Sequence, residues 1–159
     1  EIAKAKTDLR IQAYSLNAKN VAEAVVEARK SGVNVEIILD KGSNAAESNG
    51  TYFSTMNAIP TWLDGEHAVA DGNVIIIDKT VVITGSLNFT KEAESKNAEN
   101  LLILRSTRVA ALYLENWAVH RSHAEEFKQA AVAPPPPPIE KSEKKPVKPK
   151  RKRPAQRAT

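Results

Sequence analysis

The sequence predicts an α/β fold in which a mixed β-sheet is sandwiched between helices. Three observations indicate it: a helical segment between two strand-like segments, a tight two-strand hairpin, and a long helical segment near residue 120. A helix that connects two buried strands is typical of a βαβ unit, and helices on the faces of a sheet cover its apolar residues. We expect one domain over residues 1–133, followed by a tail over residues 134–159.

The first half of the domain supplies the βαβ unit. Residues 9–14 alternate between apolar and polar, and residues 33–40 are β-branched and increasingly apolar, so both segments are predicted as strands. Between them, residues 21–30 place valine and alanine on one face of a helix, which Asn17 or Asn20 is expected to cap. Residues 1–8 have the composition of a helix end, and we expect a preceding segment in the complete protein.

The second half adds further strands and the last helix. Asp78 and Lys79 mark a tight turn between two β-branched runs. Residues 101–104 are all leucine or isoleucine and are predicted as a buried strand. The remaining predicted elements are a short helix at 51–58, a short strand at 60–63, hairpin strands at 74–78 and 80–84, and a final helix at 109–128.

The composition changes sharply at Pro134. Five prolines predict a polyproline II spacer, and the tail carries nine Lys/Arg against two Glu, a net charge of +7. Because the whole chain carries +4, the globular part is mildly acidic at −3. We expect the tail to be disordered, since it has almost nothing apolar to bury. Its basic cluster predicts an electrostatic arm for nucleic acid, and a solubilising role explains it equally well; the cluster is Lys148, Lys150, Arg151, Lys152 and Arg153.

The composition also excludes two kinds of structure. The chain has no cysteine, so it has no disulfide framework and no thiolate metal site. No apolar run approaches the roughly 20 residues that span a bilayer. We predict no metal and no cofactor, with His67 at a loop edge and His120 and His123 facing solvent.

Five segments carry a pattern of motifs in a fixed order. They are residues 12–15, 28–41, 59–62, 85–90 (Gly-Ser-Leu-Asn-Phe-Thr) and 96–100 (Lys-Asn-Ala-Glu-Asn). This pattern resembles the small bacterial endonucleases of the phospholipase D superfamily. The resemblance implies the phospholipase D-like sandwich fold and a His-x-Lys-x-x-x-x-Asp (HKD) motif followed by Gly-Ser-x-Asn. It also implies a homodimer in which two motifs meet at a two-fold axis, and it is compatible with export to the periplasm of a bacterium.

The resemblance identifies six site positions, two of which depart from the family. Counting back from Asp78, the lysine position holds Asn73 and the histidine position holds Asp71. The supporting positions are retained as Ser86, Asn88 and Glu99. In the family the histidine attacks phosphorus, the lysine and asparagine hold phosphate oxygens, and the glutamate orients the histidine. Aspartate cannot attack, depart and shuttle protons as imidazole does, and we expect Asp71 to face Glu99, where two carboxylates disfavour joint ionisation.

Three hypotheses follow for this site. The favoured one is a catalytically inactive module that dimerises and binds nucleic acid through its basic tail, with an anionic membrane surface as the less favoured partner. The alternative is a residual phosphodiesterase that cleaves DNA or RNA, using Asp71 or an intact partner subunit. The third is a Mg²⁺ or Ca²⁺ site formed across a two-fold axis by Asp71, Asn73, Asn88 and Glu99.

Overall fold

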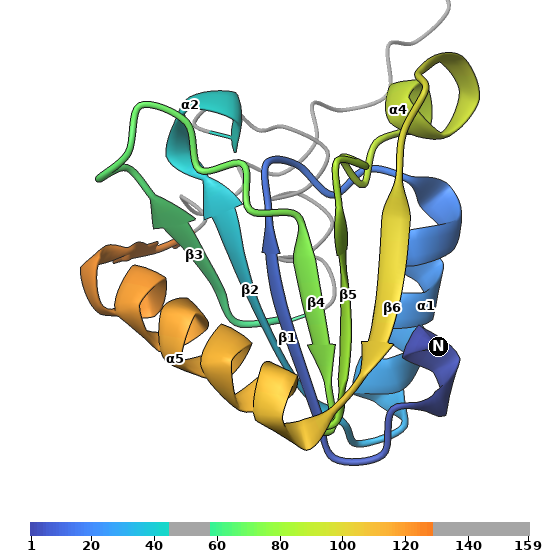
Figure 1. Cartoon of the computed structure of the whole chain (residues 1–159). Coiled ribbons are helices and arrows are strands. Elements are labelled where there is room, and N and C mark those ends of the chain that lie inside the picture. The colour runs from blue at the N-terminus through green and yellow to red at the C-terminus, as the bar shows by residue number, and fades with distance from the viewer. Residues whose placement is uncertain (45–57, 129–159) are drawn as a thin grey trace, which may run out of the picture. The chain divides into compact units, whose positions relative to one another are not determined.

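A computed structural model describes residues 1–44 and 58–128, which contain a seven-stranded mixed β-sheet (Figure 1). The strand order is β6-β5-β4-β1-β2-β3-β7. The central strands β1 (Asp8–Ala13), β2 (Asn34–Asp40) and β3 (Thr61–Asp64) are parallel neighbours. The predicted fold class, a mixed sheet with helices, is therefore confirmed.

Antiparallel strands extend the sheet on both sides of this parallel centre. β4 (Val74–Ile77) pairs with β1, β5 (Val81–Gly85) pairs with β4, and β6 (Leu101–Arg105) forms one edge beside β5. The two-residue strand β7 (Glu125–Glu126) pairs with β3 at the other edge. The β4–β5 hairpin, which the sequence predicts at residues 74–84, is confirmed.

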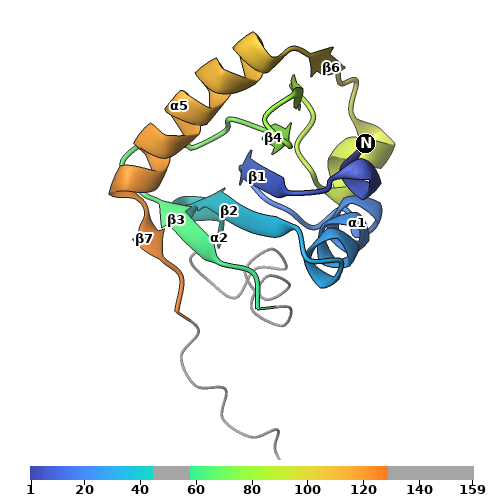
Figure 2. The same cartoon turned by 90° about the horizontal axis from the view of Figure 1, so that it is seen from below.

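Helices cover both faces of the sheet. In Figures 1 and 2, α1 (Lys19–Lys30) and α5 (Thr107–His123) lie on opposite faces. The shorter helical segments are a 3₁₀ turn, η1 (Ile2–Lys4), together with α2 (Lys41–Asn44) and α4 (Lys91–Lys96). Among the helices of the described residues, we find none that is both long and apolar enough to cross a membrane.

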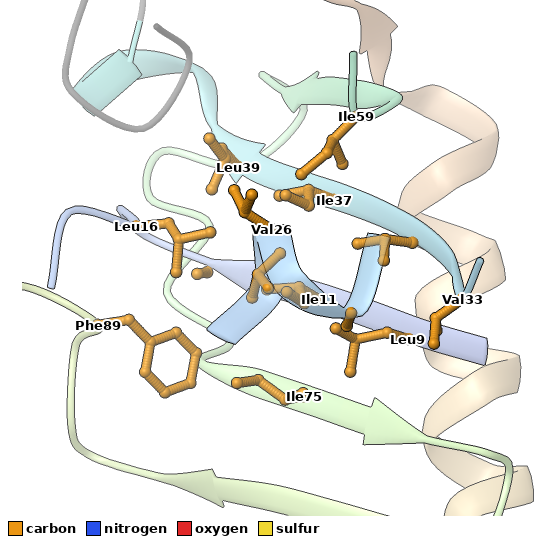
Figure 3. Close-up of a cluster of buried hydrophobic side chains, with 14 of the residues drawn as sticks. Leu9, Ile11, Leu16, Val26, Val33, Ile37, Leu39, Ile59, Ile75 and Phe89 are labelled. Atoms are coloured by element: carbon orange, nitrogen blue, oxygen red, sulfur yellow. The ribbon is translucent and has the colours of Figure 1, made fainter. Parts of the chain in front are cut away.

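Two buried clusters hold the helices to the sheet, because alternate residues of a strand point to opposite faces. On the α1 face, Ile75 and Ile77 of β4 pack with Val25 and Val26 of the helix; Figure 3 shows much of this cluster. On the opposite face, Val74 and Ile76 belong to the cluster that contains the α5 side chains Ala110 and Trp117. The central strands are therefore buried on both faces, as predicted for the segment at 33–40.

Tryptophan side chains fix α5 against the sheet. The buried Trp117 indole donates a hydrogen bond of 3.2 Å to the Ile11 carbonyl of β1. The Arg121 guanidinium lies 3.6 Å from the centre of the Trp62 ring of β3, a cation–π contact. These contacts anchor the C-terminal half of α5 beside β3.

Several local predictions are wrong. The residues predicted as a buried strand at 101–104 form the edge strand β6, where Leu101, Leu102 and Ile103 are 45%, 53% and 42% exposed. The N-terminal helix end is only the turn η1. Ala18, without a side-chain cap, precedes α1, because the Asn17 carboxamide instead accepts from the Lys91 amide.

The last helix is shorter than predicted. It ends at His123, and the chain then forms β7 with β3, in which the Phe127 amide donates to the Thr61 carbonyl. Most of the short helix predicted at 51–58, the domain boundary predicted at residue 133 and the tail at 134–159 lie outside the described residues.

Candidate functional site

The motif aspartate, Asp78, begins the β4–β5 turn. Asp78 and Lys79 have φ angles of 49° and 58°, and the Thr80 amide donates to the Ile77 carbonyl at 3.0 Å, as in a type I′ turn. The Asp78 carboxylate accepts hydrogen bonds from the backbone amides of Lys6, Thr7 and Asp8 and from the Thr7 hydroxyl. Burial favours a higher pKa for Asp78, but these hydrogen bonds outweigh it and lower the pKa.

Asp78 is separated from the other motif positions by the length of β4. Asn73 precedes the first residue of this strand and Asp78 follows its last, a span of roughly 16 Å at the rise of an extended chain. Asp78 therefore attaches the hairpin to the segment before β1, and the structure does not bring it together with Asp71 and Asn73.

Asn73, at the lysine position, lies at the centre of a hydrogen-bond network. Its side chain is buried, and its backbone is left-handed with a φ of 41°, a conformation that asparagine tolerates. The side-chain nitrogen donates to the Asp71 carboxylate at 2.7 Å and to the side-chain oxygen Oδ1 of Asn88 at 2.9 Å. The amide oxygen accepts from the Tyr14 backbone at 3.4 Å. Both ends of the Asn73 carboxamide are thus used within the chain.

Ser86 and Glu99 form a second network. The Ser86 hydroxyl donates to Glu99 at 2.5 Å and accepts from the backbone and side-chain amides of Asn100. The Asn97 amide donates to the other Glu99 oxygen at 2.9 Å. The hydrogen bonds from Ser86 and Asn97 lower the pKa of the Glu99 carboxyl.

The sequence predicts that Asp71 and Glu99 face each other, but the two residues lie in different hydrogen-bond networks. Each carboxylate has its own donors, and the pKa of Glu99 is lowered, whereas a facing carboxylate would raise it. Within the described residues, the hydrogen bonds and ion pairs of these side chains include no lysine, arginine or histidine. Five of the six predicted site residues therefore lie in two neutral or acidic networks, and the basic cluster at 148–153 lies outside the described residues.

Sequence reasoning missed a cluster of histidines around Asp64, the last residue of β3. Asp64 is fully buried, and its carboxylate lies 2.7 Å from His120 Nδ1, 3.2 Å from His123 Nε2 and 3.6 Å from His67 Nδ1. The expectation that His120 and His123 face solvent is therefore wrong, because the end of α5 packs beside β3. Their spacing of three residues, which places both on one helix face, was the available signal.

The environment of Asp64 strongly favours its charged form. Burial alone would raise the pKa, but hydrogen bonds from His120, His123 and the Glu66 amide lower it to about 2. A buried carboxylate with three imidazoles around it is a distinct site from the motif, although His67 and Asp71 belong to the same connection between β3 and β4.

Comparisons with known proteins agree with the fold and with the family that the sequence resembles. The family model described as "Cardiolipin synthase, PLD-like domain" matches residues 1–120. A protein named phospholipase D from Rickettsia prowazekii is 36% identical over 117 residues, which are 74% of this chain and 57% of that protein. The mouse mitochondrial cardiolipin hydrolase is 29% identical over 71% of this chain and 51% of its own length. The chain thus spans little more than half the length of these curated relatives.

Solved structures show the same fold over about four fifths of the chain. The phospholipase D family member Nuc from Salmonella typhimurium superposes with a TM-score of 0.76 at 34% identity, covering 80% of this chain and 86% of Nuc. NucT from Helicobacter pylori has the same fold, with a TM-score of 0.72 at 24% identity over 79% of this chain and 86% of NucT. The chain therefore belongs to the phospholipase D-like domain family.

Proposed function

We propose that this chain is a phospholipase D-like module with a degenerate HKD motif, which binds nucleic acid and dimerises but does not hydrolyse phosphodiesters. The observation that carries the proposal is the hydrogen bond between Asn73 and Asp71. These residues stand where the family pattern has lysine and histidine, and an amide and a carboxylate bonded to each other replace a cation and a nucleophile.

The electrostatics of the site support an inactive motif. Phosphoryl transfer builds negative charge on the equatorial oxygens, and positive groups stabilise that charge. Asp71 instead places a carboxylate at the nucleophile position, and Asn73 supplies no charge. The retained Ser86 and Glu99 bond to each other, which maintains the local structure of the site without adding a proton shuttle.

A Mg²⁺ or Ca²⁺ site at the motif residues is less well supported than an inactive motif without a cation. Mg²⁺ and Ca²⁺ need several oxygen ligands. The Asn73 side-chain oxygen accepts from Tyr14, and the Asn88 side-chain oxygen accepts from Asn73, so each of these oxygens already uses one lone pair within the chain.

The basic tail is the proposed contact with nucleic acid. Its net charge of +7 contrasts with −3 for residues 1–133, so attraction to a phosphate backbone would come from the tail. Binding of this kind is insensitive to sequence and weakens steeply as salt rises. The full chain is expected to retard DNA in a gel, whereas a chain ending at Ala133 is expected not to; equal retardation by both would contradict a tail contact.

The edge strand β6 supports a homodimer. Leu101, Leu102 and Ile103 leave an apolar surface on the edge strand β6, which pairs with β5 alone among the described strands and begins two residues after Glu99. Leu101 and Ile103 also line an open, largely apolar groove of about 380 Å³, together with Ile2 and Val21. An exposed apolar edge favours pairing with another chain, and a second copy would bring two motifs close together.

A phosphodiesterase assay tests the proposed inactivity. The full chain is incubated with single-stranded DNA, double-stranded DNA and bis(p-nitrophenyl) phosphate, beside Asp71→Ala. We expect no turnover from either protein. Turnover in the unmodified chain that Asp71→Ala abolishes would establish the alternative, a residual phosphodiesterase. Because relatives are named phospholipase D and cardiolipin hydrolase, vesicles containing cardiolipin provide a lipid arm of the same assay.

A further inference from the structure

The cluster around Asp64 gathers every histidine of the 159-residue sequence. The ring centres of His67, His120 and His123 lie 5.0 to 5.5 Å apart in each pair. One ligand atom from each histidine and one Asp64 oxygen all lie within 4.8 Å of one another. The three histidines come from two segments far apart in sequence, the connection after β3 and the last turn of α5.

The donor set matches a particular class of cation. Three imidazole nitrogens and one carboxylate oxygen favour Zn²⁺, whereas Mg²⁺ and Ca²⁺ prefer oxygen ligands alone. Ligand atoms about 2.0–2.2 Å from zinc in a tetrahedron are roughly 3.3 Å from each other. The distances of 2.7, 3.2 and 3.6 Å from Asp64 to its neighbours already approach this spacing.

His67 lies farthest from Asp64 of the three histidines, so its side chain would move to complete the tetrahedron. His67 follows β3 in a connection, and its side chain is 49% exposed, so it is the least enclosed of the three histidines. His120 and His123 lie on one face of α5, where Trp117 and Arg121 fix the helix against the sheet. Asp64 is buried and also accepts from the Glu66 amide at 3.1 Å, which orients the carboxylate.

Ion pairs between the histidines and Asp64 explain the cluster less completely than a bound cation does. Two imidazoles share one oxygen, Asp64 Oδ2, while His67 lies near the other. A single carboxylate compensates only one positive charge, so three protonated rings at these separations would repel one another. Three neutral rings each offer a lone pair, and a divalent cation satisfies these lone pairs and the carboxylate together.

We propose that Asp64, His67, His120 and His123 form a structural Zn²⁺ site that ties the connection after β3 to the C-terminal end of α5. Four protein ligands complete a tetrahedron, which is the pattern of structural rather than catalytic zinc. The site is independent of nucleic-acid binding and of hydrolysis. Zinc binding would also restrain the backbone before the motif, because the connection that holds His67 reaches Asp71 four residues later.

Metal binding by the full chain tests the proposal. After treatment with EDTA and its removal, calorimetric titration with Zn²⁺ is expected to give one site per chain, and Mg²⁺ no comparable binding. Elemental analysis of the dialysed complex checks the ratio. Zinc at about 100 times its Kd should raise the melting temperature by roughly 5–10 °C. Replacement by Co²⁺ should give the visible absorption spectrum of a four-coordinate site.

Variants decide whether the proposed ligands are used. His67→Ala changes a half-exposed side chain and is expected to fold, as circular dichroism would verify, while losing at least about 100-fold in zinc affinity. His120→Ala with His123→Ala should abolish binding, and Asp64→Asn should weaken it. Glu66→Gln is the matched control, an acidic residue of the same connection, and should bind as the unmodified chain does. Zinc binding weaker than millimolar, or equal affinity in His67→Ala and the unmodified chain, would overturn the proposal.

Discussion

The side-chain amide of Asn73 donates a hydrogen bond of 2.7 Å to the carboxylate of Asp71. In the motif alignment that we propose, these two positions correspond to the family's lysine and histidine, so the contact joins the two residues that would replace the catalytic groups. The same amide nitrogen reaches Asn88, one of the retained supporting positions. Asn73 and Asp71 are thus part of the hydrogen-bond network of the site. Restoring histidine and lysine at these two positions tests whether the rest of the site can still support hydrolysis.

Asp71→His combined with Asn73→Lys is expected to create phosphodiesterase activity. The pair supplies a nucleophile that also transfers protons, together with a cation for the phosphate, and general acid–base catalysis alone contributes about 10²–10⁴-fold. We therefore expect the double variant to hydrolyse bis(p-nitrophenyl) phosphate at least about 100-fold faster than the background without protein, which is the rate expected for the unmodified chain.

Each single variant is the control for this experiment. Asn73→Lys restores only the charge, and lysine in the left-handed backbone at residue 73 should cost about 1–2 kcal/mol of stability, which denaturant unfolding would measure. Activity in either single variant equal to that of the pair would contradict the two-part account. A folded but inactive double variant would show that the supporting residues no longer form a competent site.

Ser86→Ala should raise the pKa of Glu99. The Ser86 hydroxyl and the Asn97 amide hold that pKa below its ordinary value of 4.5, so removing one donor moves it back toward that value. Carboxyl ¹³C chemical shifts followed through an acid titration would measure the change. Asn97→Ala is the matched control, with a smaller increase; no shift in Ser86→Ala would mean that this hydrogen bond does not form in solution.

Local sequence signals predicted the fold well where structure depends on nearby residues. The β4–β5 hairpin was predicted from two β-branched runs around Asp78-Lys79, and the βαβ unit from alternation and helical spacing. The segment at 101–104 was predicted as buried because four consecutive aliphatic residues are typical of a central strand. Its place at the edge depends on which strands pair, and no local pattern specifies that order.

In the candidate site too, the sequence predicted which residues belong to the motif but not which of them are in contact. Motif spacing identified Asp71, Asn73, Ser86, Asn88 and Glu99, but it did not show that they form two separate networks. The Asp64 cluster was missed because His67 and His120 are 53 positions apart in sequence. Only the packing of α5 beside β3 brings them together.

Asp78→Asn should destabilise the fold at neutral pH. The carboxylate accepts five hydrogen-bond contacts from Lys6, Thr7 and Asp8, and loss of its charge should cost about 1–3 kcal/mol in the free energy of unfolding. Asparagine tolerates the left-handed backbone, so the turn itself is preserved. Urea unfolding at pH 7 would measure the difference.

The effect of Asp78→Asn should depend on pH in one direction. The pKa of Asp78 is lower in the folded chain than its ordinary value of 3.8, so its contribution is complete above about pH 4. It is lost as the pH falls through the folded pKa, and the gap between variant and unmodified chain should narrow there. Glu126→Gln, at an exposed residue, is the control; a gap that stays constant into acid would contradict this role of the charge.

Lys79→Gly should stabilise the hairpin. Lys79 has a φ of 58° in the type I′ turn, where glycine is favoured, and the relief of strain exceeds the added entropy of the unfolded chain by about 0.5–1 kcal/mol. Thermal unfolding would show a higher melting temperature. Lys79→Ala removes the same weak, exposed ion pair with Asp8 but keeps the left-handed penalty, so it should show no gain; equal stabilisation by both would rule out the backbone explanation.

Leu102→Glu should dissociate the proposed homodimer. Leu102 is 53% exposed on the edge strand β6, and a charge on an edge strand opposes its pairing with another chain. Sedimentation equilibrium should show a dimer for the unmodified chain and a monomer for the variant, with unchanged circular dichroism. Val119→Glu is the matched control, because Val119 is 60% exposed in the C-terminal half of α5, which lies beside β3 on the other side of the sheet from β6. Because β6 begins two residues after Glu99, dimer loss in Leu102→Glu alone would place the interface near Glu99. A monomeric unmodified chain, or equal loss of the dimer in both variants, would contradict pairing through β6.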